Sequence, residues 1–391
     1  MKLRCKYPSD WDWKKLGDAC AIIMGQSPPS TSYNTDGVGL PFFQGKAEFA
    51  ELHPKVEKWC DAPNKIALPN DILLSVRAPV GTTNIANQKC CIGRGLAAIR
   101  YDNYKYVFYF LRSIQQELDN KGTGTTFRAI SGKTLRETLF PLPSKETQQQ
   151  IVSKIEELFS ELDKGIEELK TAQQQLKVYR QSVLKWAFNN VAQKEYLTIE
   201  ECCTHIVDCL HSTAKFSPTG FYCVDTTCIE NGKIIFEKVR YVDEQTYTER
   251  ISRLKPVQGD ILFAREGTVG TTLIVPPNVN LCLGQRMMMF RLKGNVDSKY
   301  LMYFLQSTLF KTQYLPLIMG TTAPHLNIRD IKRFEVIVCP IDEQQQIIKE
   351  IESRLSVCDK IEETIIYSLK QAEALRQSIL KKAFEGKLIS L

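Results

Sequence analysis

The chain has 391 residues, of which 43% are hydrophobic and 24% are charged, and its formal net charge is +7. These values are ordinary for a folded protein, so they exclude a disordered, collagen-like or membrane-embedded chain. Because domains usually hold ~100–200 residues, the length predicts two or more of them. The mild positive charge permits an acidic partner such as nucleic acid without requiring one.

Targeting and redox features of the sequence predict a cytoplasmic protein. No run of ~18 apolar residues is present that could span a membrane, and residues 1–15 lack the apolar core of a signal peptide. The 13 cysteines follow no regular spacing, which favours reduced thiols over a set of disulfides. We therefore expect no membrane partner.

The sequence contains an internal duplication. Residues 148–188 align without a gap with residues 344–384, and 18 of the 41 positions are identical. The Asp-Ile-Leu and Val-Gly-Thr-Thr tokens of residues 71–83 recur at 260–272. Such a repeat predicts two copies of one structural plan. The predicted order is a first domain (1–145), a central helical spacer (146–190), a second domain (191–341) and a C-terminal helical spacer (342–391).

Both domains are predicted to be mixed. Short apolar runs bounded by Gly, Pro or Asn predict strands, in chain order, at 66–68, 72–76, 97–101, 234–236, 261–263, 273–275, 287–292 and 334–338. Helical periodicity appears at 104–115 and 298–313. The predicted fold class is therefore α+β, with two mixed α/β domains separated by two long helices.

The spacers are the predicted long helices. Apolar residues recur every three or four positions through 151–187, and no proline follows Pro143 until Pro218, or follows Pro340 at all. Start signals lie at Ser144, Glu146 and Asp342, and a stop signal at Gly386. A helix of ~40 residues spans ~60 Å, too long for its narrow apolar stripe to be buried by a small domain.

Pairing of the two spacers satisfies both stripes. Because the copies are similar, we predict an antiparallel coiled coil with pseudo-twofold symmetry. The alternative is two separate amphipathic helices, each packed on its own domain. The predicted core of the pair is Ile151, Ile155, Leu158, Leu162, Leu169, Leu176, Ile347, Ile351, Leu355, Leu369 and Ile379.

Catalytic signatures are missing from the sequence. There is no GxxxxGK[ST] loop, no Gly-rich dinucleotide fingerprint, and no Asn-Pro-Pro-Tyr or Asp-Pro-Pro-Tyr tetrapeptide of the kind that amino-methyltransferases use. A group of cysteines and histidines at 202–228 has ligand types that suit zinc. It contains no CxxC and has no counterpart in the first half, so buried thiols are the favoured interpretation and no metal site is predicted.

Sequence-specific nucleic-acid binding is better supported. Readers of DNA use Arg or Lys for guanine, Asn or Gln for adenine, and hydroxyls or backbone amides for phosphate. Loops with these residue types occur in both domains, at 31–34 and 44–46 in the first and beside the Gly-Thr-Thr tokens in each, although each residue could instead belong to a solvated loop or a structural turn. The candidates are Gln44, Lys46, Arg77, Thr82, Lys121, Thr123, Thr125, Thr126, Arg128, Arg265, Thr271, Gln285, Arg286, Thr321, Thr322 and His325.

Charge is unequal between the two domains. Residues 1–145 carry 20 basic and 13 acidic side chains, whereas residues 191–341 carry 17 and 15. The spacers are close to neutral. We therefore expect the first domain to contribute more of any salt-dependent affinity for phosphate.

The whole chain resembles the specificity (S) subunits of type I restriction–modification enzymes. The resemblance is carried by WKKLGDAC at 13–20, by the paired Asp-Ile-Leu…Val-Gly-Thr-Thr tokens, by Pro-Leu-Pro and Gln-Gln-Gln-Ile before the first helix, and by the Arg-Gln-Ser…Ala-Phe helix ends. Its second copy departs slightly, with Val338-Cys339-Pro340-Ile341 where Pro141-Leu142-Pro143 stands in the first.

The resemblance implies a DNA-binding subunit that is not itself an enzyme. Each recognition domain would read one element of an asymmetric bipartite target in double-stranded DNA. The helices would set the gap and dock two modification (M) subunits, and restriction (R) subunits would join for cleavage. This chain would hold no cofactor, since S-adenosylmethionine belongs to the modification subunit, and ATP and Mg to the restriction subunit.

Two other classes of protein remain possible at this stage. One is a self-sufficient methyltransferase or nuclease that reads its own site, which the missing motifs disfavour. The other is a DNA reader or coiled-coil scaffold of a related system outside type I restriction.

Overall fold

The computed structural model describes residues 8, 11–124, 128–230, 232–320 and 324–388. The chain divides into two compact units, which are described separately below. Unit 1 comprises Met1–Leu169 and Tyr367–Leu391, and unit 2 comprises Lys170–Ile366. Each unit therefore contains one predicted domain together with part of each long helix.

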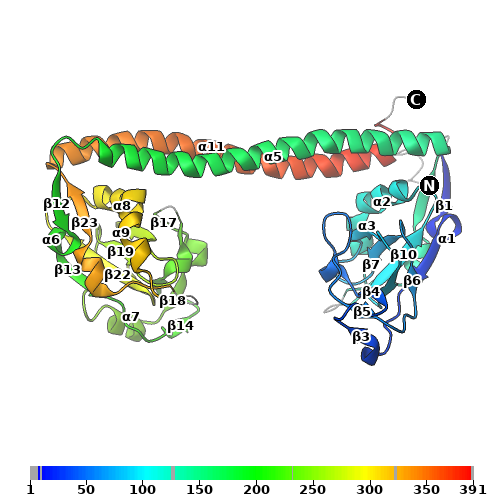
Figure 1. The fold of residues 1–391 in the computed structure, drawn as a ribbon, viewed down its shortest axis with the longest axis horizontal. Helices are drawn as coiled ribbons and strands as arrows, with labels where there is room; N and C mark the ends of the chain where they lie inside the picture. Colours follow the sequence, from blue (N-terminus) through cyan, green and yellow to red (C-terminus); the bar gives the residue numbers. More distant parts are fainter. Residues whose placement is uncertain (1–7, 9–10, 125–127, 231, 321–323, 389–391) are drawn as a thin grey trace. The chain divides into compact units, whose positions relative to one another are not determined.

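Unit 1 is built on three sheets (Figure 1). Their strand orders are β2-β10-β7-β8, β3-β5-β4-β9-β6 and β1-β11, and the β4–β9 pair is parallel. The strands are β1 (Asp12–Lys15), β2 (Ala21–Met24), β3 (Tyr33–Asn34), β4 (Leu40–Phe43), β5 (Trp59–Cys60), β6 (Ile66–Ala67), β7 (Ile72–Ser75), β8 (Thr83–Ile85), β9 (Cys90–Ile92), β10 (Leu96–Arg100) and β11 (Leu139–Leu142). The short helices are α1 (Leu16–Ala19), α2 (Tyr104–Ser113), α3 (Gln115–Asn120) and α4 (Gly132–Arg136).

Unit 2 repeats this plan. Its sheets have the orders β13-β22-β19-β20, β14-β18-β15-β21 and β12-β23, with an extra β16-β17 pair, and the β15–β21 pair is parallel. The strands are β12 (Glu195–Thr198), β13 (Cys203–Asp208), β14 (Phe216–Ser217), β15 (Phe221–Val224), β16 (Ile229–Glu230), β17 (Lys233–Ile234), β18 (Arg240–Val242), β19 (Ile261–Ala264), β20 (Thr272–Ile274), β21 (Leu281–Leu283), β22 (Met287–Leu292) and β23 (Glu335–Val338). The short helices are α6 (Ile199–Cys202), α7 (Glu244–Arg250), α8 (Ser298–Gln306), α9 (Thr308–Tyr314) and α10 (Ile328–Arg333). The predicted α+β class and internal repeat are confirmed.

Central strands of each unit are buried on both faces, which explains their nearly continuous apolar sequences. In β7, Ile72 and Leu74 contribute to the core that also holds α2, whereas Leu73 belongs to a second core with Phe43 and Ile92 of the other sheet. The alternation follows from the period of two in a strand. Both cores are therefore assembled around β7 and β10, and around β19 and β22 in unit 2.

Two predicted helices are each broken in two. The segment 104–115 is α2 followed at Ile114 by α3, and the segment 298–313 is α8 followed at Ser307 by α9. Ser307 accepts a hydrogen bond from Phe310 N through its Oγ at 3.3 Å, so its side chain caps the new helix. The capping residue was read as part of one continuous helix because the apolar spacing runs through it.

The long helices are α5 (Lys145–Asn189) and α11 (Ile341–Phe384). In unit 1 the first part of α5 packs against the last part of α11, where Asp163 pairs with Arg376. In unit 2 the last part of α5 packs against the first part of α11, where Arg180 contacts Asp359 at 2.7 Å. Within each unit the two segments are thus antiparallel, and the predicted coiled coil is confirmed.

Two of the predicted end signals, Ser144 and Gly386, are confirmed, whereas Glu146 and Asp342 lie within the first turns of α5 and α11. Ser144 Oγ accepts a hydrogen bond from Thr147 N at 3.2 Å and caps the start of α5. Beyond α11, Gly386 has a φ of +72°, and Lys387 N donates to Lys382 O at 2.9 Å. This left-handed turn satisfies the last carbonyls of the helix and stops it.

Each long helix is fixed to a domain at both of its ends. Phe188, near the end of α5, lies 5.2 Å and 5.1 Å from the rings of Tyr300 and Phe304 on α8. Phe384 does the same in unit 1 with Tyr106 and Phe110 on α2. Figure 1 shows α2 and α8 next to the long helices of their units. The expectation that a small domain would not bury the stripe was wrong for these ends.

The predicted stripe accordingly has two kinds of member. Those near the helix ends are buried in the domain cores, namely Ile151, Ile155, Ile351 and Ile379. Those that are partly buried are Leu158, Leu162, Leu169, Leu176, Ile347, Leu355 and Leu369. Among the described residues, no helix is both long and apolar enough to cross a membrane.

Candidate nucleic-acid interface

Arg77 and the Gly-Thr loop (residues 121–128) are brought together in unit 1. A backbone bridge joins Arg77 to Ala129, and a second joins Thr123 to Ala129. Ala78 N donates to Arg128 O at 2.9 Å. Arg77, Thr123 and Arg128 are all exposed, so three candidates meet on one surface.

Carboxylates accompany the other cations of this loop. Lys121 pairs with Glu117 at 2.6 Å and Arg128 with Asp119 at 3.5 Å, and all four side chains are at least partly exposed. Exposed pairs of this kind contribute little stability, so both cations can be redirected to a phosphate at low cost. The candidates Thr125 and Thr126 lie outside the described residues.

Unit 2 has an acidic residue at the place of Arg77. Glu266 makes the bridge to His325 that Arg77 makes to Ala129, and Gly267 N donates to Pro324 O at 2.8 Å. The carboxylate of Glu266 lies 3.6 Å from Arg286. Since Thr321 and Thr322 lie outside the described residues, His325 is the described candidate of this loop.

Arg265 is not placed to meet a phosphate. Its Nε donates to Asp208 Oδ1 at 2.9 Å, and the two side chains are only 11% and 7% exposed. The structural counterpart of Arg265 is Val76. The backbone N of Arg265 donates to Arg286 O just before β22, as that of Val76 donates to Gly95 O just before β10. The prediction for Arg265 is therefore corrected: breaking this buried pair would leave an uncompensated charge, so it supports the fold.

The Gly-Thr-Thr turns have a structural role. Ser75 N donates to Thr82 O at 2.8 Å, and Ala264 N donates to Thr271 O at 2.8 Å, which closes the β7–β8 and β19–β20 hairpins. Gly81 and Gly270 have φ of +83° and +88°, values that favour glycine. Thr82 Oγ1 donates to Pro79 O at 3.2 Å. The recurrence of this token thus follows from hairpin geometry, and Thr82 and Thr271 are weak candidates for DNA contacts.

Gln44 and Lys46 follow β4 in unit 1 and are both exposed. They lie beside the β9–β10 turn, where a Cβ on Gly95 would come within 2.0 Å of Gln44 O. Arg94, in the same turn, is also exposed but was missed from the sequence. These three polar side chains share one edge of the unit.

The equivalent edge of unit 2 holds Asp225, Arg240, Gln285 and Arg286. Gly95 and Arg286 accept matching hydrogen bonds from Val76 N and Arg265 N, at 2.9 Å and 3.0 Å. Asp225 follows β15 as Gln44 follows β4. The candidates Gln285 and Arg286 thus lie where Arg94 and Gly95 lie in unit 1.

Arg240 and its partner Asp225 were also missed by sequence reasoning. Cys223 pairs with Arg240 in unit 2, and Phe42 N donates to Lys58 O in unit 1. Phe42 and Cys223 are equivalent residues of β4 and β15. Lys58 and Arg240, which lie opposite them on the neighbouring strand, therefore occupy the same place in the two units. The available signal was a cation followed by an aromatic residue, Lys58-Trp59 in the first domain and Arg240-Tyr241 in the second.

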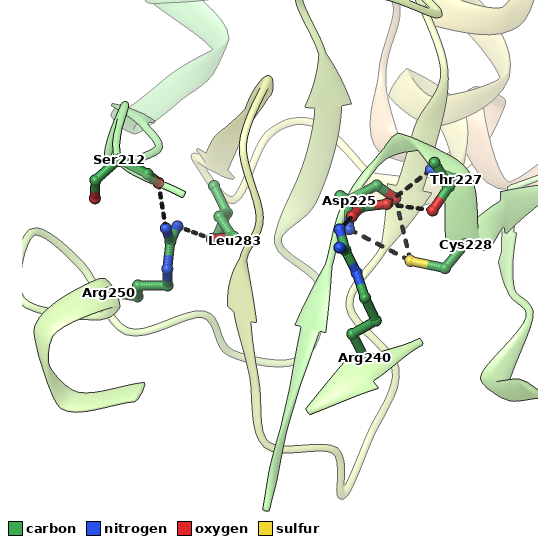
Figure 2. Close-up of polar contacts among 7 residues, drawn as sticks. All are labelled: Ser212, Asp225, Thr227, Cys228, Arg240, Arg250 and Leu283. Atoms are coloured by element: carbon green, nitrogen blue, oxygen red, sulfur yellow. Dashed lines mark hydrogen bonds and ion pairs between the residues drawn. The ribbon is translucent and has the colours of Figure 1, made fainter. Parts of the chain in front are cut away.

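Asp225 holds Arg240 in place, as Figure 2 shows. Asp225 Oδ2 accepts from Arg240 Nη2 at 2.5 Å, and Asp225 Oδ1 accepts from Thr227 N and Oγ1 at 2.9 Å and 2.6 Å. Burial opposes ionisation of Asp225, but the hydrogen bonds from Thr227 and Arg240 outweigh it and lower the pKa of its carboxyl. The pair is thus charged at neutral pH.

The cysteines at 202–228 are buried thiols. Burial raises the pKa of Cys202 to about 11, of Cys203 to about 12 and of Cys228 to about 11. Groups of three or more His, Cys, Asp or Glu side chains that could hold a metal ion do not occur among the described residues. Cys202, Cys203 and Cys228 are therefore uncharged at neutral pH and contribute to packing.

Comparisons with known proteins all point to one family. The family model for the type I restriction modification DNA specificity domain matches residues 8–171 and 222–371. The putative type I restriction enzyme MjaX specificity subunit of Methanocaldococcus jannaschii is 46% identical over 154 residues, which cover 38% of this chain and only 36% of that protein.

Two further relatives differ in how much of the chain they cover. The type I restriction enzyme MjaVIII specificity subunit of the same organism is 23% identical across 98% of this chain and 94% of its own length. A crystal structure of the HsdS subunit from Thermoanaerobacter tengcongensis is 49% identical across 39% of this chain and 38% of that one, with a TM-score of 0.36.

Proposed function

Because this chain belongs to the family of type I restriction modification DNA specificity domains, we propose that it is the DNA-reading subunit of a type I restriction–modification complex. Each unit reads one element of a bipartite target in double-stranded DNA. The subunit carries no catalytic group of its own and is required for both methylation and restriction.

One observation supports this proposal above the others. The two units share one fold, yet the polar side chains at equivalent places differ: exposed Gln44 against buried Asp225, exposed Lys58 against exposed Arg240, and exposed Arg77 against partly exposed Glu266. Base edges are distinguished by the donors and acceptors that meet them. Two such surfaces would therefore read different sequences, and the target is asymmetric.

Partner subunits are proposed for the long helices. Exposed apolar side chains on these helices include Val178 at 67% on α5 and, one turn apart on α11, Val357 at 55% and Ile361 at 43%. Exposed apolar groups in a row along a helix mark surfaces for protein contact. We infer that the helices dock two modification subunits and set the gap between the elements, and that restriction subunits join this assembly.

The cofactors of the reaction are then those of the partners. S-adenosylmethionine is placed on the modification subunits, and ATP and Mg on the restriction subunits, in a cytoplasmic complex. A DNA reader or scaffold of a related methylation system is the alternative.

A methylome comparison tests the proposal. Methylated adenines are mapped genome-wide in cells that carry or lack this chain, with its modification subunit present in both. The expected result is one bipartite asymmetric motif that disappears without the chain. A motif that persists without it, or methyl transfer by the purified chain alone, would contradict the proposal.

A further inference from the structure

A hollow of about 230 Å³ opens in unit 2 beside the end of β15. It lies between the loop that precedes β14, the turn after β15 and the β21–β22 turn. Its polar lining residues include Thr213, Asp225, Thr227, Arg240, Gln285 and Arg286. The hollow is large enough for the edge of a base and presents donors and acceptors inward, which is what direct readout requires.

Arg240 is the most precisely held cation of this hollow. Its Cζ lies 3.7 Å from the centre of the Phe216 ring, and one nitrogen, Nη2, is bound by Asp225. About half of the side chain is exposed. Stacking fixes the plane of the guanidinium, and the carboxylate fixes its rotation within that plane. The Nη1 edge is left to face a ligand.

The walls of the hollow are fixed by a buried arginine. Arg250 donates from Nη1 to Leu283 O at 2.9 Å and from Nη2 to Ser212 O at 2.5 Å (Figure 2). These bonds tie the loop before β14 to the end of β21. Gln285 Nε2 adds a bond to His211 O at 2.8 Å. Arg250 is therefore a positioning residue, which keeps the lining groups in place before DNA arrives.

We propose that Arg240 recognises a guanine in the element read by unit 2, through the N7 and O6 acceptors on the major-groove edge of that base. This inference rests on the proposed function. Arginine presents paired donors that match these two acceptors, and this is the most frequent specific contact in DNA recognition. Because the group is already oriented, little conformational entropy is lost when it binds.

The neighbouring carboxylate distinguishes a base from a phosphate. Asp225 lies within 2.5 Å of Arg240 and carries a full negative charge. A phosphate at the free edge of the guanidinium would be repelled by it, whereas a guanine edge is neutral and offers acceptors only. Arg286, beside the partly exposed Glu266 at 3.6 Å, is less tightly held and suits a phosphate contact better.

The experiment uses the assembled complex of this chain with its modification subunit. A duplex library with randomised half-sites is methylated with S-adenosylmethionine, and the methylated products are sequenced. The variants are Arg240→Ala and Arg240→Lys, and Arg329→Ala, at an exposed arginine of α10 that does not line the hollow, is the matched control. Unfolding midpoints of all variants verify that unit 2 remains folded.

The expected result is local. Arg240→Ala lowers the preference for guanine at one position of one element by roughly 10- to 100-fold, and leaves the other element and the gap unchanged. Arg240→Lys retains the charge but lacks the fork, so it loses most of the preference as well. Arg329→Ala leaves the motif as it is.

Two results would overturn the inference. One is that the Arg240→Ala variant keeps the guanine preference of the wild-type complex at all positions of the element. The other is a uniform loss of binding at all sequences with a weaker salt dependence, which is the signature of a phosphate contact. A wild-type complex that methylates no defined sequence would instead overturn the proposed function, so the two failures are distinguishable.

Discussion

Units 1 and 2 share the ion pairs that hold their folds together and differ in the polar residues at their reading edges. Asp71 and Arg100 form a two-bond ion pair in unit 1, and Asp260 and Arg291 form it in unit 2. Lys105–Glu156 and Lys299–Glu352 tie equivalent short helices to the long ones, at 2.7 Å and 2.6 Å. The duplication has kept these contacts while the residues at the reading edges have diverged.

The difference between the edges is a difference in charge. Unit 1 presents Arg77, Lys58 and Arg94 with the uncharged Gln44 at the place of Asp225, whereas unit 2 has the Arg240–Asp225 pair and has Glu266 at the place of Arg77. Cations alone or in exposed pairs favour phosphate, and a cation held by a buried carboxylate, as Arg240 is by Asp225, favours a base edge. We therefore expect unit 1 to supply more affinity and unit 2 more discrimination per cation.

The largest effect is expected from the two phenylalanines near the ends of the long helices, which pack on α8 and α2. Phe188→Ala and Phe384→Ala each empty a site that is at most 4% exposed, and each should cost about 3–5 kcal/mol of unfolding free energy. Hydrogen exchange should show lost protection in α8 and α9 for the first variant and in α2 and α3 for the second. Loss of protection in both units from either single variant would contradict the equivalence of these contacts.

A smaller effect is expected from the first glutamine of each Gln-Gln-Gln-Ile token. Gln344 Nε2 donates to Cys339 O at 2.8 Å and to Asn295 O at 2.9 Å, and Asp297 N donates to its Oε1 at 2.8 Å. Gln148 donates to Pro143 O at 3.0 Å and to the Tyr101 hydroxyl at 3.2 Å. Replacing either by Ala should cost about 1–3 kcal/mol, because buried partners lose their bonds.

Gln344→Ala should cost more than Gln148→Ala, since three groups lose a partner instead of two. Chemical denaturation monitored by hydrogen exchange in each unit measures both. The neighbouring Gln149 and Gln345 are exposed, so Gln149→Ala and Gln345→Ala are the controls and should change stability little. An equal, small cost at all four positions would show that the token is not an anchor.

Much of the architecture could be predicted from periodicity and repetition. The token Gln-Gln-Gln-Ile and the helix stripes predicted the long antiparallel helices, because burial of one face requires spacing of three or four residues. The break at Ser307 could not be found in this way, since apolar spacing continues through it. It depends on a single side-chain hydrogen bond to the next turn.

The reading edges were only partly predictable. Arg77, Gln285 and Arg286 were found because they lie near repeated tokens, and Gln44 because its amide lies in a polar loop. Arg240 and Asp225 were missed because they are 15 residues apart and meet only when β15 pairs with β18. Arg265 was misjudged for the complementary reason: the sequence shows a cation beside a loop, but not the buried Asp208 that accepts its hydrogen bond.

The smallest expected effect concerns the charge reversal at Arg77 and Glu266, which make equivalent bridges to their loops. A contact between Arg77 and one phosphate releases counterions, so Arg77→Gln should reduce the slope of log K against log salt by ~0.9. Glu266→Gln removes a repulsion instead, and should tighten binding at low salt without lowering that slope. Anisotropy of the labelled target duplex, bound by the complex with the modification subunit at several salt concentrations, measures both. Equal slopes for wild type and Arg77→Gln would show that Arg77 does not face a phosphate, and that the charge excess of unit 1 acts elsewhere on its surface.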